Sequence, residues 1–329
     1  GMEKMPTGFI PDQDKGYLLV NVQLPDGAAV ERTQAVMKRM ERIARELPGV
    51  AHTVALSGQS LLLGANAPNF GSMYVMLKEF HDRRGAALTS TAIANRLRDR
   101  CNRDVREALV SVFGAPPVDG LGNAGGFKLM LEDRGNLGLH ALQETSDNLV
   151  KRGNSTPCLQ GLFTSLRADT PWIYLDIDRT KAKSMGVKVG DVFNALQVYM
   201  GSLYVNNFNE FGRSWQVNVQ ADSQFRQSAA QVKQLKVRNA DGEMVPLSTI
   251  IEARDMSGPV MVMRYNMYPA AAINGDLAPG TSSGQAIERM QQLADEVLPP
   301  AMSYQWTELT YMQILAGSTA MHVFGLAVV

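Results

Sequence analysis

The chain has 329 residues, of which 45% are hydrophobic and 19% charged, a balance that argues against an intrinsically disordered protein and against a polytopic membrane protein. Its length predicts roughly two to three compact modules. Because 32 basic residues offset 32 acidic ones, no long-range positive field would attract nucleic acid, and we do not expect a nucleic-acid-binding protein.

The first third of the chain predicts the order strand, helix, strand, strand, helix, strand. β-rich runs indicate the strands, and apolar residues three and four apart indicate the helices. We expect these elements at residues 17–24, 30–47, 50–56, 73–77, 90–105 and 109–113, with a loop rich in Gly, Asn and Ser at 57–71. This order is typical of the split βαβ, ferredoxin-like unit, in which two helices cover one face of an antiparallel sheet.

A second unit of this kind begins later and is interrupted. Its first half is predicted as a strand, a helix and a strand at residues 127–131, 139–150 and 162–166, and its second half in the same order at 270–277, 282–297 and 302–306. The insert, about 171–258, carries short strands at 172–177, 202–205, 215–219 and 235–237 and a helix at 189–200. We therefore predict an α+β protein with two ferredoxin-like units, the second interrupted by a mixed α+β subdomain.

The glycine pattern of residues 120–125 resembles a dinucleotide-binding fingerprint. That fingerprint needs a helix N-terminus to receive the phosphate, but here a predicted strand follows. We interpret these glycines as a hinge between modules.

A calcium-loop opening is incomplete at residues 12–16. Asp12 and Asp14 fit, but Gly16 and Gln23 stand where oxygen ligands are needed, which favours a capped turn before the first strand.

Other metal-binding and catalytic patterns are incomplete as well. Ser60 lacks the flanking residues of a nucleophile elbow and is interpreted as a loop residue. Cys101 and Cys158 form no metal-binding spacing and leave the redox compartment undecided. The four histidines are too far apart in sequence to indicate zinc or a hydrolase base, although folding could bring some together: His52, His81, His140 and His322. We predict no catalytic site, no metal site and no cofactor.

Eighteen methionines raise the question of copper or silver ligation through thioethers. Met37, Met40 and Met290 have the spacing of core residues, so packing is the favoured interpretation.

The end of the chain, residues 313–329, becomes increasingly apolar. A membrane-spanning helix needs about 20 mostly apolar residues, so we interpret residues 309–329 as the start of a truncated span, with an ordinary buried helix as the alternative.

Several ordered segments are distinctive: residues 8–16, 22–27, 31–34, 176–178, 181–187, 204–208, 240–247 and 278–284. Together they resemble the second periplasmic loop of AcrB-like multidrug efflux pumps of the resistance-nodulation-division superfamily. The resemblance implies a linker at 1–15, a first porter subdomain at 16–121, a second at 122–170 and 259–308, a docking subdomain at 171–258, and the start of a membrane helix at 309–329.

By the same resemblance, substrate would pass a cleft walled partly by the first porter subdomain. The implied pocket positions are Asn21, Val54, Tyr74, Ser111 and Phe113, with Arg167 at the entrance and Gly120 where the best-known members carry a carboxylate. A switch loop would run from Gly58 to Asn66 and include Ser60 and Gly64. Gln59 and Leu61 stand where those members place phenylalanines, so we expect less aromatic stacking and a different substrate preference.

The resemblance implies the substrate-binding, gating and docking part of a proton-driven pump that exports apolar or amphiphilic compounds, not an enzyme. It further implies a homotrimer in a Gram-negative inner membrane, with this segment in the periplasm, a periplasmic adaptor and an outer-membrane channel as partners. Two alternatives are open: a heavy-metal exporter of the same superfamily, which clustered methionines facing the cleft would favour, and a non-transport periplasmic binding or adaptor module.

Overall fold

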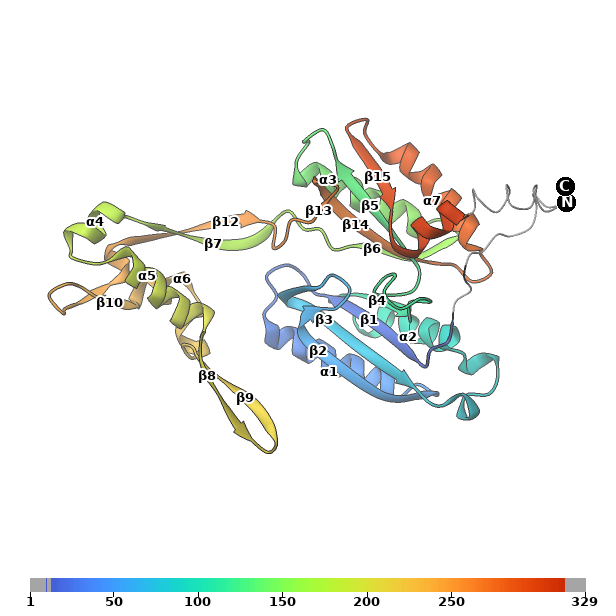
Figure 1. Cartoon of the computed structure of the whole chain (residues 1–329), viewed down its shortest axis with the longest axis horizontal. Helices are drawn as coiled ribbons and strands as arrows, with labels where there is room; N and C mark the ends of the chain where they lie inside the picture. The colour runs from blue at the N-terminus through green and yellow to red at the C-terminus, as the bar shows by residue number, and fades with distance from the viewer. Residues whose placement is uncertain (1–9, 11–12, 317–329) are drawn as a thin grey trace. The chain divides into compact units, whose positions relative to one another are not determined.

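The computed structural model describes residue 10 and residues 13–316 (Figure 1). The chain forms two compact units, one comprising residues up to Thr170 and from Pro259 onward, the other Pro171–Gly258. Its helices and antiparallel sheets confirm the predicted α+β class.

The first compact unit contains two lobes, of which the first comprises residues 17–114. Its elements are β1 (Tyr17–Gln23), α1 (Val30–Arg45), β2 (Val50–Ser60), β3 (Ala65–Leu77), α2 (Ser90–Asp104) and β4 (Leu109–Gly114). The strands form an antiparallel sheet in the order β2-β3-β1-β4. Alternate residues of β1, Leu18, Val20 and Val22, pack with apolar residues of α1 and α2 in one core, as a strand covered on one face by helices requires.

The prediction of a loop at residues 57–71 is wrong. The structure continues β2 to Ser60 and starts β3 at Ala65, leaving only residues 61–64 as a turn. Cross-strand partners include Gln59 with Asn66 and Ser60 with Ala65, after a register shift near Gly58. Small and polar residues have low intrinsic strand propensity, but pairing with a neighbouring strand overrides it here.

The second lobe comprises residues 127–169 and 259–306. Its elements are β5 (Phe127–Asp133), α3 (Leu139–Asn154), β6 (Leu159–Thr164), β13 (Arg264–Tyr265), β14 (Tyr268–Leu277), α7 (Ser283–Val297) and β15 (Met302–Trp306). The long strands follow the order β6-β14-β5-β15, which repeats the topology of the first lobe. Leu129, Leu149, Ile273 and Met290 are central to its core. The ferredoxin-like arrangement is thus present twice.

The second compact unit has its own small core. Its elements are β7 (Thr170–Ile177), α4 (Arg179–Ser184), α5 (Val189–Leu196), β8 (Leu203–Glu210), β9 (Arg213–Val219), α6 (Ala229–Gln234), β10 (Lys236–Arg238), β11 (Met244–Pro246) and β12 (Ile251–Gly258). The strands pair as β7 with β12, β8 with β9, and β10 with β11. Val192, Val232 and Leu247 are buried together. Within this unit the β8–β9 hairpin extends away from the helices (Figure 1).

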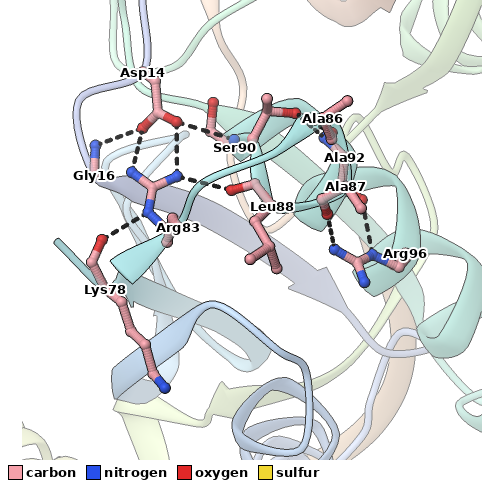
Figure 2. A network of polar contacts seen from close by, with 11 residues as sticks. Asp14, Gly16, Lys78, Arg83, Ala86, Ala87, Leu88, Ser90, Ala92 and Arg96 are labelled. Atoms are coloured by element: carbon pink, nitrogen blue, oxygen red, sulfur yellow. Dashed lines mark hydrogen bonds and ion pairs between the residues drawn. The ribbon is translucent and has the colours of Figure 1, made fainter. Parts of the chain in front are cut away.

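The segment that leads into β1 is fixed to the first lobe by a buried ion pair (Figure 2). The Arg83 side chain is 2% exposed and donates to both Asp14 oxygens at 2.8 and 3.0 Å, and to the carbonyl oxygens of Lys78 and Leu88. Asp14 also accepts from the backbone N–H groups of Gly16 and Ser90. The predicted turn before the first strand is therefore present.

The predictions for the two ends of the chain concern mainly residues that the structure does not describe. Residues 308–316 are helical, whereas 317–329, which hold most of the predicted truncated span, lie outside the described residues, as do 1–9 and 11–12 of the predicted linker. Among the residues that the structure describes, no helix has the length and apolar character needed to cross a membrane.

Candidate functional site

The predicted pocket residues of the first lobe share the sheet face that the helices leave uncovered. Tyr74 lies opposite both Leu19 and Val54, and Phe113 lies opposite Leu19. Asn21 lies opposite Ser111 on the neighbouring strand. Successive side chains of a strand point to opposite faces of the sheet, so these residues point away from the core that holds Leu18 and Val20. The fold therefore brings the five predicted positions onto one surface, and their role in binding stays a prediction.

These side chains differ in their exposure to solvent. Val54 is 54% exposed and Tyr74 is half-buried, so both could meet a ligand, whereas Asn21 and Ser111 are buried. Phe113 is 2% exposed because it packs against Phe163 of the second lobe, with ring centroids 5.8 Å apart, and against Leu62. In this structure Phe113 belongs to the contact between the lobes.

The predicted switch segment is held by buried hydroxyl groups. The Ser60 hydroxyl donates to Asn21 Oδ1 at 2.7 Å and accepts from the backbone N–H of Leu63 at 3.3 Å. The Ser72 hydroxyl donates to the Gln59 carbonyl oxygen and accepts from the Leu61 N–H. Ser60 is therefore the last residue of β2, where its hydroxyl stabilises the following turn, and not the plain loop residue that was predicted. No sequence pattern indicates the role of Ser72, because that role arises only from strand register.

Replacing Ser60 with alanine should lower the free energy of unfolding of the first lobe by about 1–3 kcal/mol. The change leaves the buried Asn21 Oδ1 without its donor and the Leu63 N–H without its acceptor. Urea denaturation, monitored by amide hydrogen exchange in β2 and β3, would measure this loss in the free energy of unfolding. Ser57→Ala, on the same hairpin at a half-buried position, is the matched control. Equal effects of the two changes would show that the Ser60 hydroxyl does not hold the turn.

A hollow lies between the two lobes; it is partly open to solvent and has a cavity volume of about 30 Å³. The first lobe contributes Gln23, Leu63 and Phe70, and the turn after β1 contributes Asp26. The second lobe contributes Arg167 together with Met261, Met263 and residues 270–272. Gln23 belongs to the same uncovered face as Asn21, two residues along β1. None of the five predicted pocket positions on that face lines the hollow; of the individually predicted site residues, only Arg167 does.

Arg167 lies in this hollow between two carboxylates. Its Nε is 3.9 Å from Asp26 Oδ2, its Nη1 is 3.9 Å from Asp147 Oδ1, and Nη1 also donates to the Leu166 carbonyl oxygen at 2.7 Å. Burial raises the pKa of the Asp26 carboxyl, and the Arg167 charge opposes that rise. Arg167 therefore lies at a polar edge of the hollow.

Gly120 lies apart from the hollow. It is exposed, and a side chain at its position would meet open space. The neighbouring Asp119 does carry a carboxylate, but that group binds Lys15 at 2.8 Å. The structure thus gives Gly120 no lining role in the hollow.

Within the described part of the chain, no three His, Cys, Asp or Glu side chains lie close enough to hold a metal ion. His81 lies beside Asp82 and His140 beside Asp169, while His322 is outside the described residues. The core positions predicted for Met37, Met40 and Met290 are confirmed.

Cys101 and Cys158 are both free thiols. Burial in the first core raises the pKa of the Cys101 thiol to about 12, so it is not a reactive nucleophile at neutral pH.

Comparison with known proteins gives a consistent result over the whole sequence. The family model described as the AcrB/AcrD/AcrF family matches residues 1–329. The multidrug export protein AcrF of Escherichia coli K12 is 34% identical over 96% of this chain. The multidrug/solvent efflux pump membrane transporter MepB of Pseudomonas putida is 32% identical over 99%, and MdtF of E. coli K12 is 31% identical over 99%. The match covers 31% of the length of each relative.

Proposed function

This chain belongs to the AcrB/AcrD/AcrF family of resistance-nodulation-division efflux transporters, and we propose that it supplies the substrate cleft of such a pump. Its named relatives are transporters and not enzymes. The cargo we propose is apolar or amphiphilic, in keeping with the multidrug and solvent exporters among those relatives.

The observation that supports this proposal most directly is the hollow between the two lobes. Its walls combine apolar side chains, Leu63, Phe70, Met261 and Met263, with a polar edge formed by Asp26 and Arg167. Burial of apolar ligand surface contributes about 25 cal/mol per Å², while a few polar groups orient the ligand. Flexible methionines fit different apolar shapes, which suits a pump with several substrates.

Opening of the cleft requires the lobes to separate. We propose that they move as near-rigid bodies about residues 116–126, where Pro116, Pro117 and several glycines join the first sheet to the second. The contact among Leu62, Phe113 and Phe163 would then break in an open state. The switch segment from Gly58 to Asn66 carries Leu62 and would move with the first lobe.

The remaining roles in this proposal follow the family. The second compact unit would dock toward an outer-membrane channel, with a periplasmic adaptor as a further partner, in a homotrimer of the inner membrane whose periplasmic side holds this segment. Proton movement through the membrane part of the full-length protein would drive the cycle, at about 2.3 kcal/mol per charge per 100 mV.

Locking the lobe contact should stop transport. We would introduce Leu62→Cys and Phe163→Cys into an otherwise cysteine-free full-length parent and join them with a reducible bis-maleimide. Efflux of a fluorescent amphiphile from cells without their own pumps should fall to about a tenth or less when the bridge is formed, a loss equivalent to about 1.4 kcal/mol or more, and return on reduction.

Each single-cysteine variant, treated identically, is the control for labelling itself. Full efflux by the bridged protein would show that the lobes need not part, and the proposed mechanism would be abandoned.

A further inference from the structure

The linker of residues 116–126 borders a partly open cavity of about 230 Å³. Pro117 and Gly126 of the linker line this cavity together with Leu309 and Thr310, which belong to the helix at residues 308–316. Protein interiors are normally close-packed, so unfilled space of this size leaves one side of the linker without packing partners. The position of the linker therefore depends on specific contacts made elsewhere along it.

One of these contacts comes from Glu308, the first residue of the 308–316 helix. Its Oε1 pairs with Lys128 Nζ at 3.0 Å, and both side chains are mostly buried. Its Oε2 lies beside Gly122 of the linker, where a Cβ would be only 2.7 Å away. Glu308 has φ +57°, a left-handed conformation that is costly for a residue with a side chain and persists where the surrounding contacts enforce it. Glu308 is thus fixed to the second lobe and faces the linker.

The next two linker residues contact the turn of residues 61–64 in the switch segment. Asn123 Nδ2 donates to the carbonyl oxygen of Leu62 at 3.3 Å. Ala124 packs against the apolar cluster that contains Leu62. Three consecutive linker residues, beginning at Gly122, therefore touch the 308–316 helix on one side and the switch segment on the other.

We propose that Glu308 and Asn123 are positioning residues that couple the 308–316 helix to the switch segment through the linker. The Glu308 carboxylate limits how far the linker moves at Gly122, and the Asn123 amide passes that restraint to the Leu62 carbonyl oxygen. The proposal rests on the proposed function of the cleft, in which the switch segment moves during transport, and it identifies the contacts through which a shift of the helix reaches that segment.

Amide hydrogen exchange of the 329-residue chain tests this coupling. The reporters are the N–H groups of Leu61 and Leu63, which donate to the hydroxyls of Ser72 and Ser60. Glu308→Gln removes the paired charge at nearly constant size, so the linker should fluctuate more. Both reporter amides should then exchange about threefold faster, at the lower end of the coupling measured between distant sites.

Glu296→Gln is the matched control. It removes a carboxylate that pairs with Arg152 in the same lobe, and it should leave the exchange of both reporter amides unchanged. The amide of Leu149, in the core of α3, serves as an internal reference for the stability of the second lobe. Equal acceleration at Leu149 and at the reporters in Glu308→Gln would show general destabilisation and would overturn the coupling.

Asn123→Ala separates a coupled path from two independent effects. The change removes the donor to Leu62, so by itself it should accelerate the same two amides about threefold. In this background Glu308→Gln should add nothing, because the contact that transmits its effect is gone. Additive effects of the two changes, or unchanged reporter amides in Glu308→Gln alone, would refute the proposal. Exchange is measured without transport, so either result would leave the proposed cleft in place, and the bridging experiment tests that cleft independently.

Discussion

Replacing Arg83 with methionine should destabilise the first lobe by about 3 kcal/mol, the scale expected when one partner of a buried ion pair is removed. The Arg83 guanidinium pairs with both Asp14 oxygens and donates to the carbonyl oxygens of Lys78 and Leu88, so its loss leaves four acceptor oxygens each short of a donor (Figure 2). Amide hydrogen exchange of β1 and β3 would report the loss within this lobe. Arg100→Met is the control, because its partner Glu46 is half exposed and such surface pairs contribute about 0–1 kcal/mol.

The same pair predicts how stability depends on pH. Burial raises the pKa of Asp14, but hydrogen bonds from Arg83, Gly16 and Ser90 and the Arg83 charge outweigh it and lower the pKa to about 2, from 3.8. Because the pKa of Asp14 is lower in the folded chain than in the unfolded chain, its ionised form stabilises the folded state at pH values above the unfolded pKa. About 2 kcal/mol of the free energy of unfolding should therefore be lost as pH falls from about 4 to about 2. Asp14→Asn should remove this part of the acid sensitivity. An unchanged acid transition in that variant would contradict the assignment.

Replacing Gly126 with alanine should destabilise the second lobe by about 3–5 kcal/mol. Gly126 has φ +90°, a conformation that alanine adopts only under strain, and a Cβ there would lie 2.2 Å from the carbonyl oxygen of Gly275. Gly275 is on β14, paired with Phe127, so its backbone cannot move without disturbing the sheet. Strain and steric overlap therefore act together.

Fluorescence of Trp306 can follow this change, since its ring packs edge-on against Phe127, with centroids 5.8 Å apart. Trp172 and Trp215 would first be replaced with phenylalanine so that only the second lobe is observed. Gly120→Ala is the matched control in the same linker: φ is +86°, but a Cβ would meet nothing within 4 Å. It should lose only about 1 kcal/mol. Similar losses of stability in the two variants would mean that backbone strain alone causes the loss at Gly126 and that the steric overlap with β14 contributes nothing.

The sequence by itself determined most of the two lobes. Leu18, Val20 and Val22 alternate on β1, and Val36, Met40 and Ile43 recur at helical spacing on α1, and all are buried in one core. Such patterns are local because a strand or helix covered on one face must repeat its apolar residues with its own period. The family resemblance also came from ordered local segments, and the family match over residues 1–329 confirms it.

The tertiary structure decided what depends on distant partners. The polar residues of the 57–71 segment become strand through pairing, Ser72 gains its role through register, and Asp14 meets Arg83 across 69 positions. The family resemblance implied that Phe113 is a pocket position, yet Phe163 of the other lobe packs against it. The hydrogen bond from Asn123 to Leu62 was also invisible in the sequence, because whether a polar atom finds a partner depends on which groups folding brings within hydrogen-bond distance.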